Sequence, residues 1–183
     1  MARTARRLFA ANGYAATTIS EISGGANIPL QTIYSAFGNK PAILEEIRRL
    51  WIADADVQEL HRQALATADA RESLRLAARW TRRQMELGSD VISMYQEASR
   101  TDPRIAETWR QVLWSREAAI RRLLNSIAPQ CRRGLKPDQA LDVYVTCTLA
   151  EIYRTLVSER GWPPHRYETW LSDLLIHEML DQP

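Results

Sequence analysis

Apolar residues recur at every third or fourth position along most of the chain, and this spacing predicts helices throughout. Ala, Leu, Arg and Glu are frequent, and no segment has the alternation of apolar and polar residues typical of strands. Glycine and proline fall between the periodic segments, where they end or begin helices. The pattern therefore predicts an all-α fold with about nine helices.

Four helices are predicted in the first quarter of the chain. The first ends at Gly13, which tolerates a positive φ. Thr18 and Glu21 have the spacing of a capping box and begin the second. Pro29 begins the third, since a first helical position needs no backbone N–H, and Asn39 caps a longer fourth helix.

Five longer helices are predicted in the rest of the chain, with periodic segments at 70–87, 90–99, 103–127, 137–161 and 164–179. The segment 137–161 is apolar around most of its circumference, so such a helix must bury two faces. Together with the apolar stripe of 164–179, it predicts a four-helix bundle between two copies of the chain. A helix that is merely central in a monomer is the alternative. The residues assigned to the dimer interface are Leu149, Ile152, Leu156, Trp170, Leu171, Leu174 and Leu175.

The second and third helices form a helix-turn-helix pattern, because both are short and a turn of three to four residues joins them. In this arrangement the second short helix enters the major groove of DNA, while the first crosses the backbone. The candidate recognition helix spans 29–37, with Ile33 and Phe37 facing inward. We expect a helix-turn-helix domain over 1–47 and a larger helical domain over 48–183.

Fourteen positions of the first domain carry a family signature in both identity and spacing: Leu8-Phe9, Gly13-Tyr14, Thr17-Thr18, Ile22, Ala26, Ile28, Thr32-Ile33-Tyr34, Phe37 and Lys40. With these residues the chain resembles the TetR/AcrR family of helix-turn-helix transcriptional regulators. The resemblance covers residues 1 to about 50. In the remaining two-thirds only the helix pattern matches.

The resemblance implies a homodimer that binds a near-palindromic double-stranded DNA operator and responds to a small apolar or amphipathic effector, as a repressor. The DNA contacts that it implies are Thr18, Leu30, Gln31, Thr32, Tyr34, Ser35 and Lys40. Thr18, Tyr34 and Lys40 would contact phosphate, Thr32 phosphate or base, and the others base edges. Gln31 is the most informative, because its amide can pair bidentately with adenine. An activator, or a helical protein-interaction module without a small-molecule effector, remain alternatives.

Two residues depart from the family pattern. Asn27 stands where glycine is usual, a mild change because Asn tolerates a left-handed backbone. Pro29 replaces the usual capping serine, so the third helix lacks that cap. By this resemblance the sequence also starts part-way through the family's first helix.

Charge adds little to this interpretation. Over the whole chain the net charge is only +2, too small to indicate nucleic-acid binding by itself. Residues 1–49 contain six Lys and Arg and three Glu, so the first quarter carries the net positive charge. Arg6 and Arg7 fit either a phosphate-binding patch or an ordinary solvated face.

Aromatic and methionine side chains suggest an effector pocket in the larger domain, since ligand pockets are mostly apolar with few polar groups. The candidates are Trp80, Gln84, Met85, Met94, Tyr95, Trp109, Trp114, Tyr144 and Glu151. For any single one of them an ordinary place in the core is the simpler interpretation. A cationic ligand would need Glu151 to be buried.

Catalytic and metal-binding patterns are not found. The three histidines have no ligand spacing, the two cysteines form no CxxC motif, and no Ser/His/Asp set or glycine-rich phosphate loop occurs. We therefore expect no enzymatic activity, no metal and no cofactor. No signal peptide or run of 18 apolar residues is present, which predicts a cytoplasmic protein without membrane contact.

Overall fold

The computed structural model describes residues 1–181 and confirms the all-α prediction. These residues form ten α-helices and no strand, apart from an isolated bridge between Cys131 and Leu180. They divide into two compact units, one comprising Met1–Asp54 and Gly88–Val112, the other Ala55–Leu87 and the described part of Leu113–Pro183. The helices α6 (Ala70–Ala98) and α7 (Pro103–Ile127) each contribute to both units.

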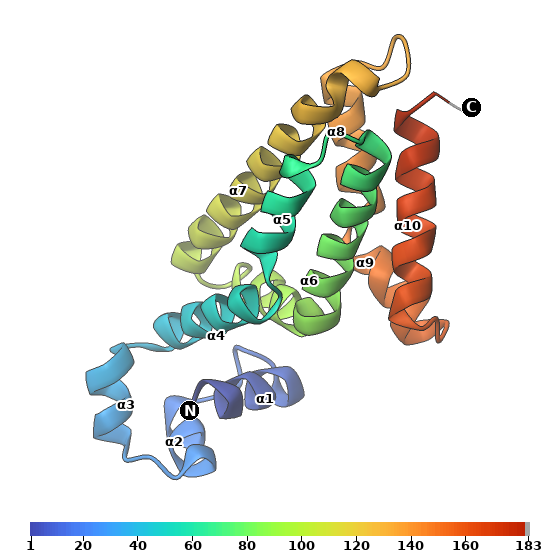
Figure 1. Cartoon of the computed structure of the whole chain (residues 1–183). Coiled ribbons are helices and arrows are strands. Elements are labelled where there is room, and N and C mark those ends of the chain that lie inside the picture. Colours follow the sequence, from blue (N-terminus) through green and yellow to red (C-terminus); the bar gives the residue numbers. More distant parts are fainter. Residues whose placement is uncertain (182–183) are drawn as a thin grey trace. The chain divides into compact units, whose positions relative to one another are not determined.

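The first unit contains the four predicted N-terminal helices, which are α1 (Ala2–Asn12), α2 (Ile19–Ala26), α3 (Leu30–Phe37) and α4 (Lys40–Asp54) (Figure 1). The second part of α6 and the first part of α7 complete this unit. Its core consists of apolar side chains that are at most 4% exposed, including Ala5, Phe9, Tyr14, Ile22, Ile33, Ile43, Leu44, Ile47 and Trp51.

The predicted helix caps of this unit are confirmed. Thr18 Oγ1 accepts a hydrogen bond from Glu21 N (3.1 Å), and the Glu21 carboxylate accepts one from Thr18 N (2.6 Å). Asn27 ends α2 in the left-handed region, with φ 53 and ψ 44. Asn39 Oδ1 accepts from Ala42 N (2.9 Å) at the start of α4. These caps satisfy backbone groups that the helix ends leave unpaired.

The helix α6 departs from helical geometry at Gly88, where φ is −154 and ψ is 17. This is the point between the two helices that the sequence pattern predicts at 70–87 and 90–99. Trp51 of α4 lies directly against Gly88: a Cβ atom at this position would be 2.0 Å from Trp51 Nε1. Glycine is therefore required at this position by the close approach of a buried indole.

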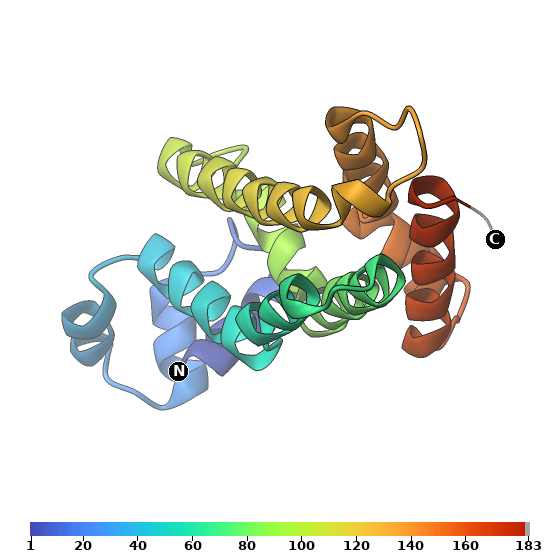
Figure 2. The same cartoon turned by 45° about the horizontal axis from the view of Figure 1, so that its top comes forward.

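The second unit is a helical bundle (Figures 1 and 2). It contains α5 (Val57–Ala66), parts of α6 and α7, α8 (Pro137–Cys147), α9 (Ala150–Tyr153) and α10 (Pro164–Met179). The sequence pattern did not predict α5, although its buried residues Leu60 and Ala64 have helical spacing. In α10 the predicted stripe is buried at Tyr167, Leu171, Leu175 and Met179.

One long helix over 137–161 was expected, and this prediction is wrong. The segment is divided into α8, α9 and a π-helical turn at Arg154–Glu159, and Leu149 between α8 and α9 is extended. Side chains replace the helical bonding there: Thr148 Oγ1 donates to the Tyr144 carbonyl (2.7 Å), and Arg116 Nη2 donates to Thr148 Oγ1 (2.5 Å) and to the Thr148 carbonyl (3.3 Å). No glycine or proline marks this break, so the pattern did not reveal it.

Replacing Gly88 by alanine is expected to lower the free energy of unfolding by about 1–3 kcal/mol, as overpacking of a filled core does. The added methyl group would collide with the Trp51 indole, which is only 4% exposed. Chemical denaturation measures the effect. Gly24→Ala is the control, because a Cβ at this helical position meets nothing within 4 Å. An unchanged unfolding midpoint for Gly88→Ala would contradict the role assigned to this contact.

Candidate nucleic-acid interface

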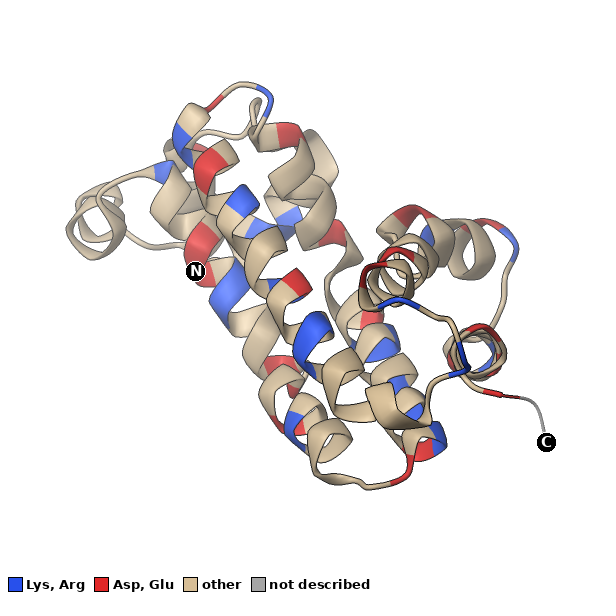
Figure 3. Cartoon of the chain, turned by 90° about the horizontal axis from the view of Figure 1, so that it is seen from above, with Lys and Arg blue, Asp and Glu red and all other residues tan. Residues whose placement is uncertain are grey.

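The outward side of α3 carries five of the seven predicted DNA contacts. Leu30 and Tyr34 are 40% and 46% exposed, and Gln31, Thr32 and Ser35 are exposed as well. By contrast, Ile33 is only 2% exposed and anchors α3 to the core. No residue of α3 is charged, so this face offers hydrogen-bonding and apolar groups without a charge of its own (Figure 3).

The turn before α3 is held by side-chain and backbone hydrogen bonds. Ser23 Oγ donates to the Ile28 carbonyl (2.6 Å), and Asn27 N donates to the carbonyls of Ser23 and Gly24. Pro29 then precedes α3 in an extended conformation, and no side chain caps the helix there. As the sequence predicted, Pro29 in place of the usual serine leaves α3 without a side-chain N-cap.

Thr18 is exposed at the start of α2, where its hydroxyl serves the capping box. The same hydroxyl lies 2.9 Å from Glu21 Oε2. Hydrogen bonds from the backbone and side chain of Thr18 lower the pKa of Glu21. A negative charge therefore lies beside the residue that the family resemblance assigns to phosphate.

Lys40 is half-buried, and its ammonium is directed into the protein. Nζ donates to the carbonyls of Tyr14 (2.8 Å), Thr17 (2.9 Å) and Ala15 (3.3 Å), and it lies 4.4 Å from the centroid of the Tyr14 ring. Burial lowers the pKa of Lys40, and the carboxylates of Glu97 and Glu21 partly offset this effect. An ammonium has three hydrogens, and three carbonyls occupy them in this arrangement.

Glu97 holds the other side of the same loop. From α6, its carboxylate accepts hydrogen bonds from Tyr14 N and Ala15 N, both at 3.2 Å. Gly13 has a φ of 85, and a Cβ there would lie 3.0 Å from Glu97 Oε1. The loop between α1 and α2 is thus fixed by an anion on its N–H groups and a cation on its carbonyls. Sequence reasoning missed Glu97, since no local pattern relates it to a loop more than 80 positions earlier.

Most basic residues of the N-terminal region are engaged within the protein. Arg6 forms two hydrogen bonds to the Asp90 carboxylate, at 2.6 and 2.7 Å. Arg48 and Arg49 pair with glutamates one turn earlier in α4. Arg3 and Arg7 are exposed and form no ion pair within residues 1–181, so the available positive charge of this region lies on α1.

The predicted pocket residues divide between the two units. Met94, Tyr95 and Trp109 belong to the first unit, where the rings of Tyr95 and Trp109 stack with centroids 5.1 Å apart. The other six belong to the second unit: Trp80, Gln84, Met85, Trp114, Tyr144 and Glu151.

Within the second unit these candidates differ in burial. Trp114 is 74% exposed and Glu151 is exposed, so neither is enclosed by the described chain. Tyr144 is fully buried: its hydroxyl lies 3.2 Å from Thr81 Oγ1 and 3.3 Å from the Ala77 carbonyl. The cationic-ligand site considered from the sequence needs a buried Glu151, which the structure does not provide.

The predicted dimer-interface residues also differ in exposure. Leu171 and Leu175 are fully buried within the chain, so they stabilise its own core and cannot face a partner. Leu149 is 45% exposed at the break between α8 and α9. The remaining ones are half-buried: Ile152, Leu156, Trp170 and Leu174.

Other kinds of site find no support in the described chain. No cluster of three or more His, Cys, Asp and Glu in residues 1–181 is arranged to hold a metal ion, and both cysteines are free thiols. None of the helices in this range has the length and apolar character needed to cross a membrane.

Comparison with known proteins gives a family match for the N-terminal residues. Residues 3–47 match the family described as bacterial regulatory proteins, tetR family. Curated protein sequences give no match. Solved structures match over nearly the whole chain at low sequence identity, and at this level the likeness shows the fold alone.

Three of these structures illustrate the likeness. A protein from Saccharomonospora viridis described as a transcriptional regulator, in complex with choline, has a TM-score of 0.77 and 21% identity, over 99% of this chain and 96% of that one. The TetR family regulator PfmR from Thermus thermophilus has a TM-score of 0.70 and 20% identity, over 99% and 98%. FadR from Bacillus subtilis, in complex with stearoyl-CoA, has a TM-score of 0.74 and 17% identity, over 96% and 95%.

Replacing Lys40 by methionine is expected to lower the free energy of unfolding by about 1–3 kcal/mol, because partly buried loop carbonyls lose their donors. It should weaken DNA binding through this loop and leave the salt dependence of binding unchanged. Lys136→Met, which changes the exposed lysine before α8, is the matched control. If the slope of log K against log salt instead falls by about 1, Lys40 contacts phosphate directly, as the resemblance implies.

Proposed function

We propose that this chain, whose residues 3–47 belong to the TetR family of bacterial regulatory proteins, is a ligand-responsive transcriptional repressor that binds a near-palindromic DNA operator as a homodimer. The observation that carries the proposal is α3, a short helix with one residue buried and an uncharged, hydrogen-bonding face exposed. An α-helix with such a face fits the major groove, where base edges present donors and acceptors.

Residues 1–47 form the DNA-binding domain in this proposal, and residues 48–183 bind the effector and dimerise, without enzymatic activity. Leu30, Gln31 and Ser35 read base edges. Thr18, Thr32 and Tyr34 contact phosphate, and Lys40 acts mainly by holding the loop before α2. The exposed Arg3 and Arg7 add positive charge for phosphate, which DNA-binding proteins need for affinity.

The effector is a small apolar or amphipathic molecule. Two of the similar structures hold ligands of opposite charge, since choline is a cation and the thioester stearoyl-CoA carries phosphates. The neighbours therefore support a ligand-binding role and leave the charge of the ligand open. Ligand binding would reduce DNA affinity by favouring a dimer state whose recognition helices do not fit successive grooves.

Selection of bound sequences from a random DNA pool tests the DNA-binding role. We expect a near-palindromic site with salt-sensitive affinity, and Gln31→Ala should change the base preference at one position per half-site, at a cost of about 1–3 kcal/mol for the original base. Gln58→Ala, an exposed glutamine on α5, is the control. The absence of any salt-sensitive binding to duplex DNA would overturn the proposal.

The dimer is tested separately by sedimentation. Leu149→Arg places a charge on an exposed leucine of the proposed interface and should shift the dimer toward monomer. Leu65→Arg is the matched control, because Leu65 is 36% exposed on α5 and lies outside that interface. A Leu149→Arg protein that remains as dimeric as the wild type would contradict dimerisation through this surface.

A further inference from the structure

Arg116 is a basic residue in the second unit that lacks an acidic partner. It projects from α7, and its guanidinium is so enclosed by protein atoms that desolvation lowers its pKa, although the residue as a whole is half-buried. Within residues 1–181 no carboxylate lies at ion-pair distance from it. Both of its hydrogen bonds come from Nη2 and go to Thr148. The N–H groups on Nε and Nη1 have no acceptor among these residues.

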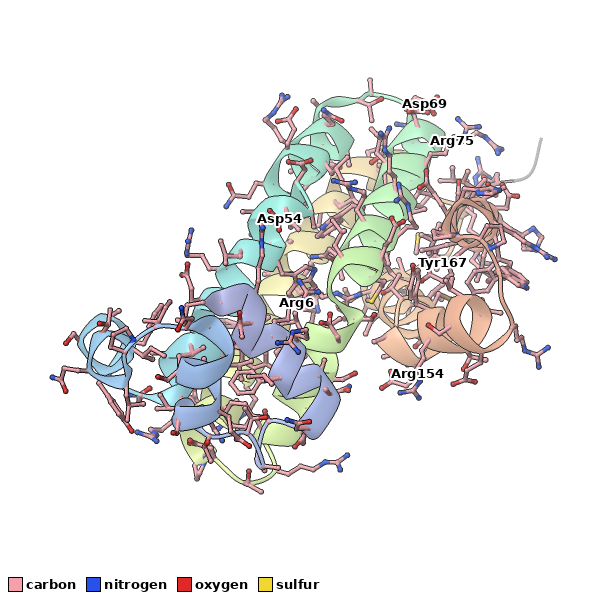
Figure 4. The ribbon with its side chains drawn as sticks, turned by 90° about the horizontal axis from the view of Figure 1, so that it is seen from below. Arg6, Asp54, Asp69, Arg75, Arg154 and Tyr167 are labelled. Carbon is pink, nitrogen blue, oxygen red and sulfur yellow. The ribbon has the colours of Figure 1, made fainter. Side chains whose placement is uncertain are left out.

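The hydroxyl of Tyr167 on α10 has no hydrogen-bond partner in the described chain either. The residue is fully buried inside the second unit (Figure 4), and its ring meets that of Tyr153 edge-on at 4.9 Å. Burial raises the pKa of Tyr167 and the charge of Arg116 lowers it, so the two groups interact electrostatically. A buried neutral phenol can donate a hydrogen bond, and a protein rarely leaves such a donor unused.

What these groups lack is an acceptor. In the described chain the buried side-chain polar atoms without a partner are the Tyr167 hydroxyl and Trp80 Nε1, and both are donors in the second unit. A buried cation costs free energy unless an anion compensates it. The unpaired donors and the uncompensated charge together call for an anion.

A purely structural role for Arg116 is the simpler alternative. Its bonds to Thr148 lie at the C-terminal end of α8, where a cation interacts favourably with the helix dipole. This role, however, occupies one of the three guanidinium nitrogens and leaves the Tyr167 hydroxyl unexplained.

We propose that Arg116 and Tyr167 bind the carboxylate of an apolar organic acid, which is the effector class of the regulator proposed above. A guanidinium N–H outside the bonds to Thr148 can donate a charge-assisted hydrogen bond to a carboxylate oxygen, and the Tyr167 hydroxyl can donate another. The rings of Tyr153 and Trp170, with centroids 4.9 and 5.7 Å from that of Tyr167, supply apolar surface for the body of the acid. A quaternary ammonium would meet a like charge there and is disfavoured.

The inference rests on the proposed function for its regulatory meaning, but carboxylate binding can be measured without DNA. Calorimetric titration of the full-length protein compares octanoate and benzoate with 1-octanol and octyltrimethylammonium, at one ionic strength. The carboxylates should bind at least about 10-fold more tightly than the other two, since hydrogen bonds to a charged group contribute about that much or more. Arg116→Met should weaken octanoate binding by about 10-fold or more, whereas Arg122→Met, on an exposed arginine of α7, should not.

Tyr167→Phe keeps the test valid if Arg116→Met does not fold. It removes a hydroxyl that has no partner within the described chain, so it should leave stability unchanged or raise it, while weakening octanoate binding about 3- to 10-fold. Equal binding of octanol and octanoate, failure of both carboxylates to bind, or unchanged affinity in a folded Arg116→Met protein would each overturn the inference. Carboxylate binding without DNA binding would instead overturn the proposed function and leave the carboxylate site in place.

Discussion

The helix-turn-helix of this protein depends on its attachment to the second part of α6. The helices α1, α2 and α3 have 11, 8 and 8 residues, and segments this short bury too little apolar surface to be stable alone. From α6, Asp90 binds Arg6, the Tyr95 hydroxyl donates to Glu45 (2.8 Å), and Glu97 accepts from the loop after α1. One helix thus fixes α1, α4 and the entry to α2.

This attachment explains why Lys40 and Glu97, near the proposed recognition helix, are engaged within the protein. Lys40 and Glu97 act on one loop from opposite sides, and each satisfies backbone groups that the turn leaves unpaired. The positive charge of the N-terminal region is consequently not concentrated beside α3. In the proposed function, uncharged residues on α3 read the bases. Arg3 and Arg7 on α1 attract the DNA phosphates by their charge.

Features set by neighbouring residues could be predicted from the sequence. The Thr18–Glu21 capping box and the left-handed Asn27 follow from side chains within a few positions, so the pattern revealed them. The break at Thr148 could not be predicted, because the side chain that bonds to it, Arg116, lies 32 positions away. Leu171 and Leu175 show a related limit: periodicity identifies an apolar face but does not say whether the chain's own core or a partner covers it.

An effector in the second unit can change DNA binding only if it binds one of two protein states more tightly, by about 1–3 kcal/mol for ordinary coupling. The residue proposed to bind that effector is Arg116. Its Nη2 donates to the Thr148 carbonyl where α8 ends, so a carboxylate bound to the same guanidinium would lie close to that break. Arg116 also lies on α7, which contributes to both units, as does α6 with its non-helical Gly88 held against Trp51. In the proposal, the charged group that recognises the effector therefore lies on a helix that contributes to both units.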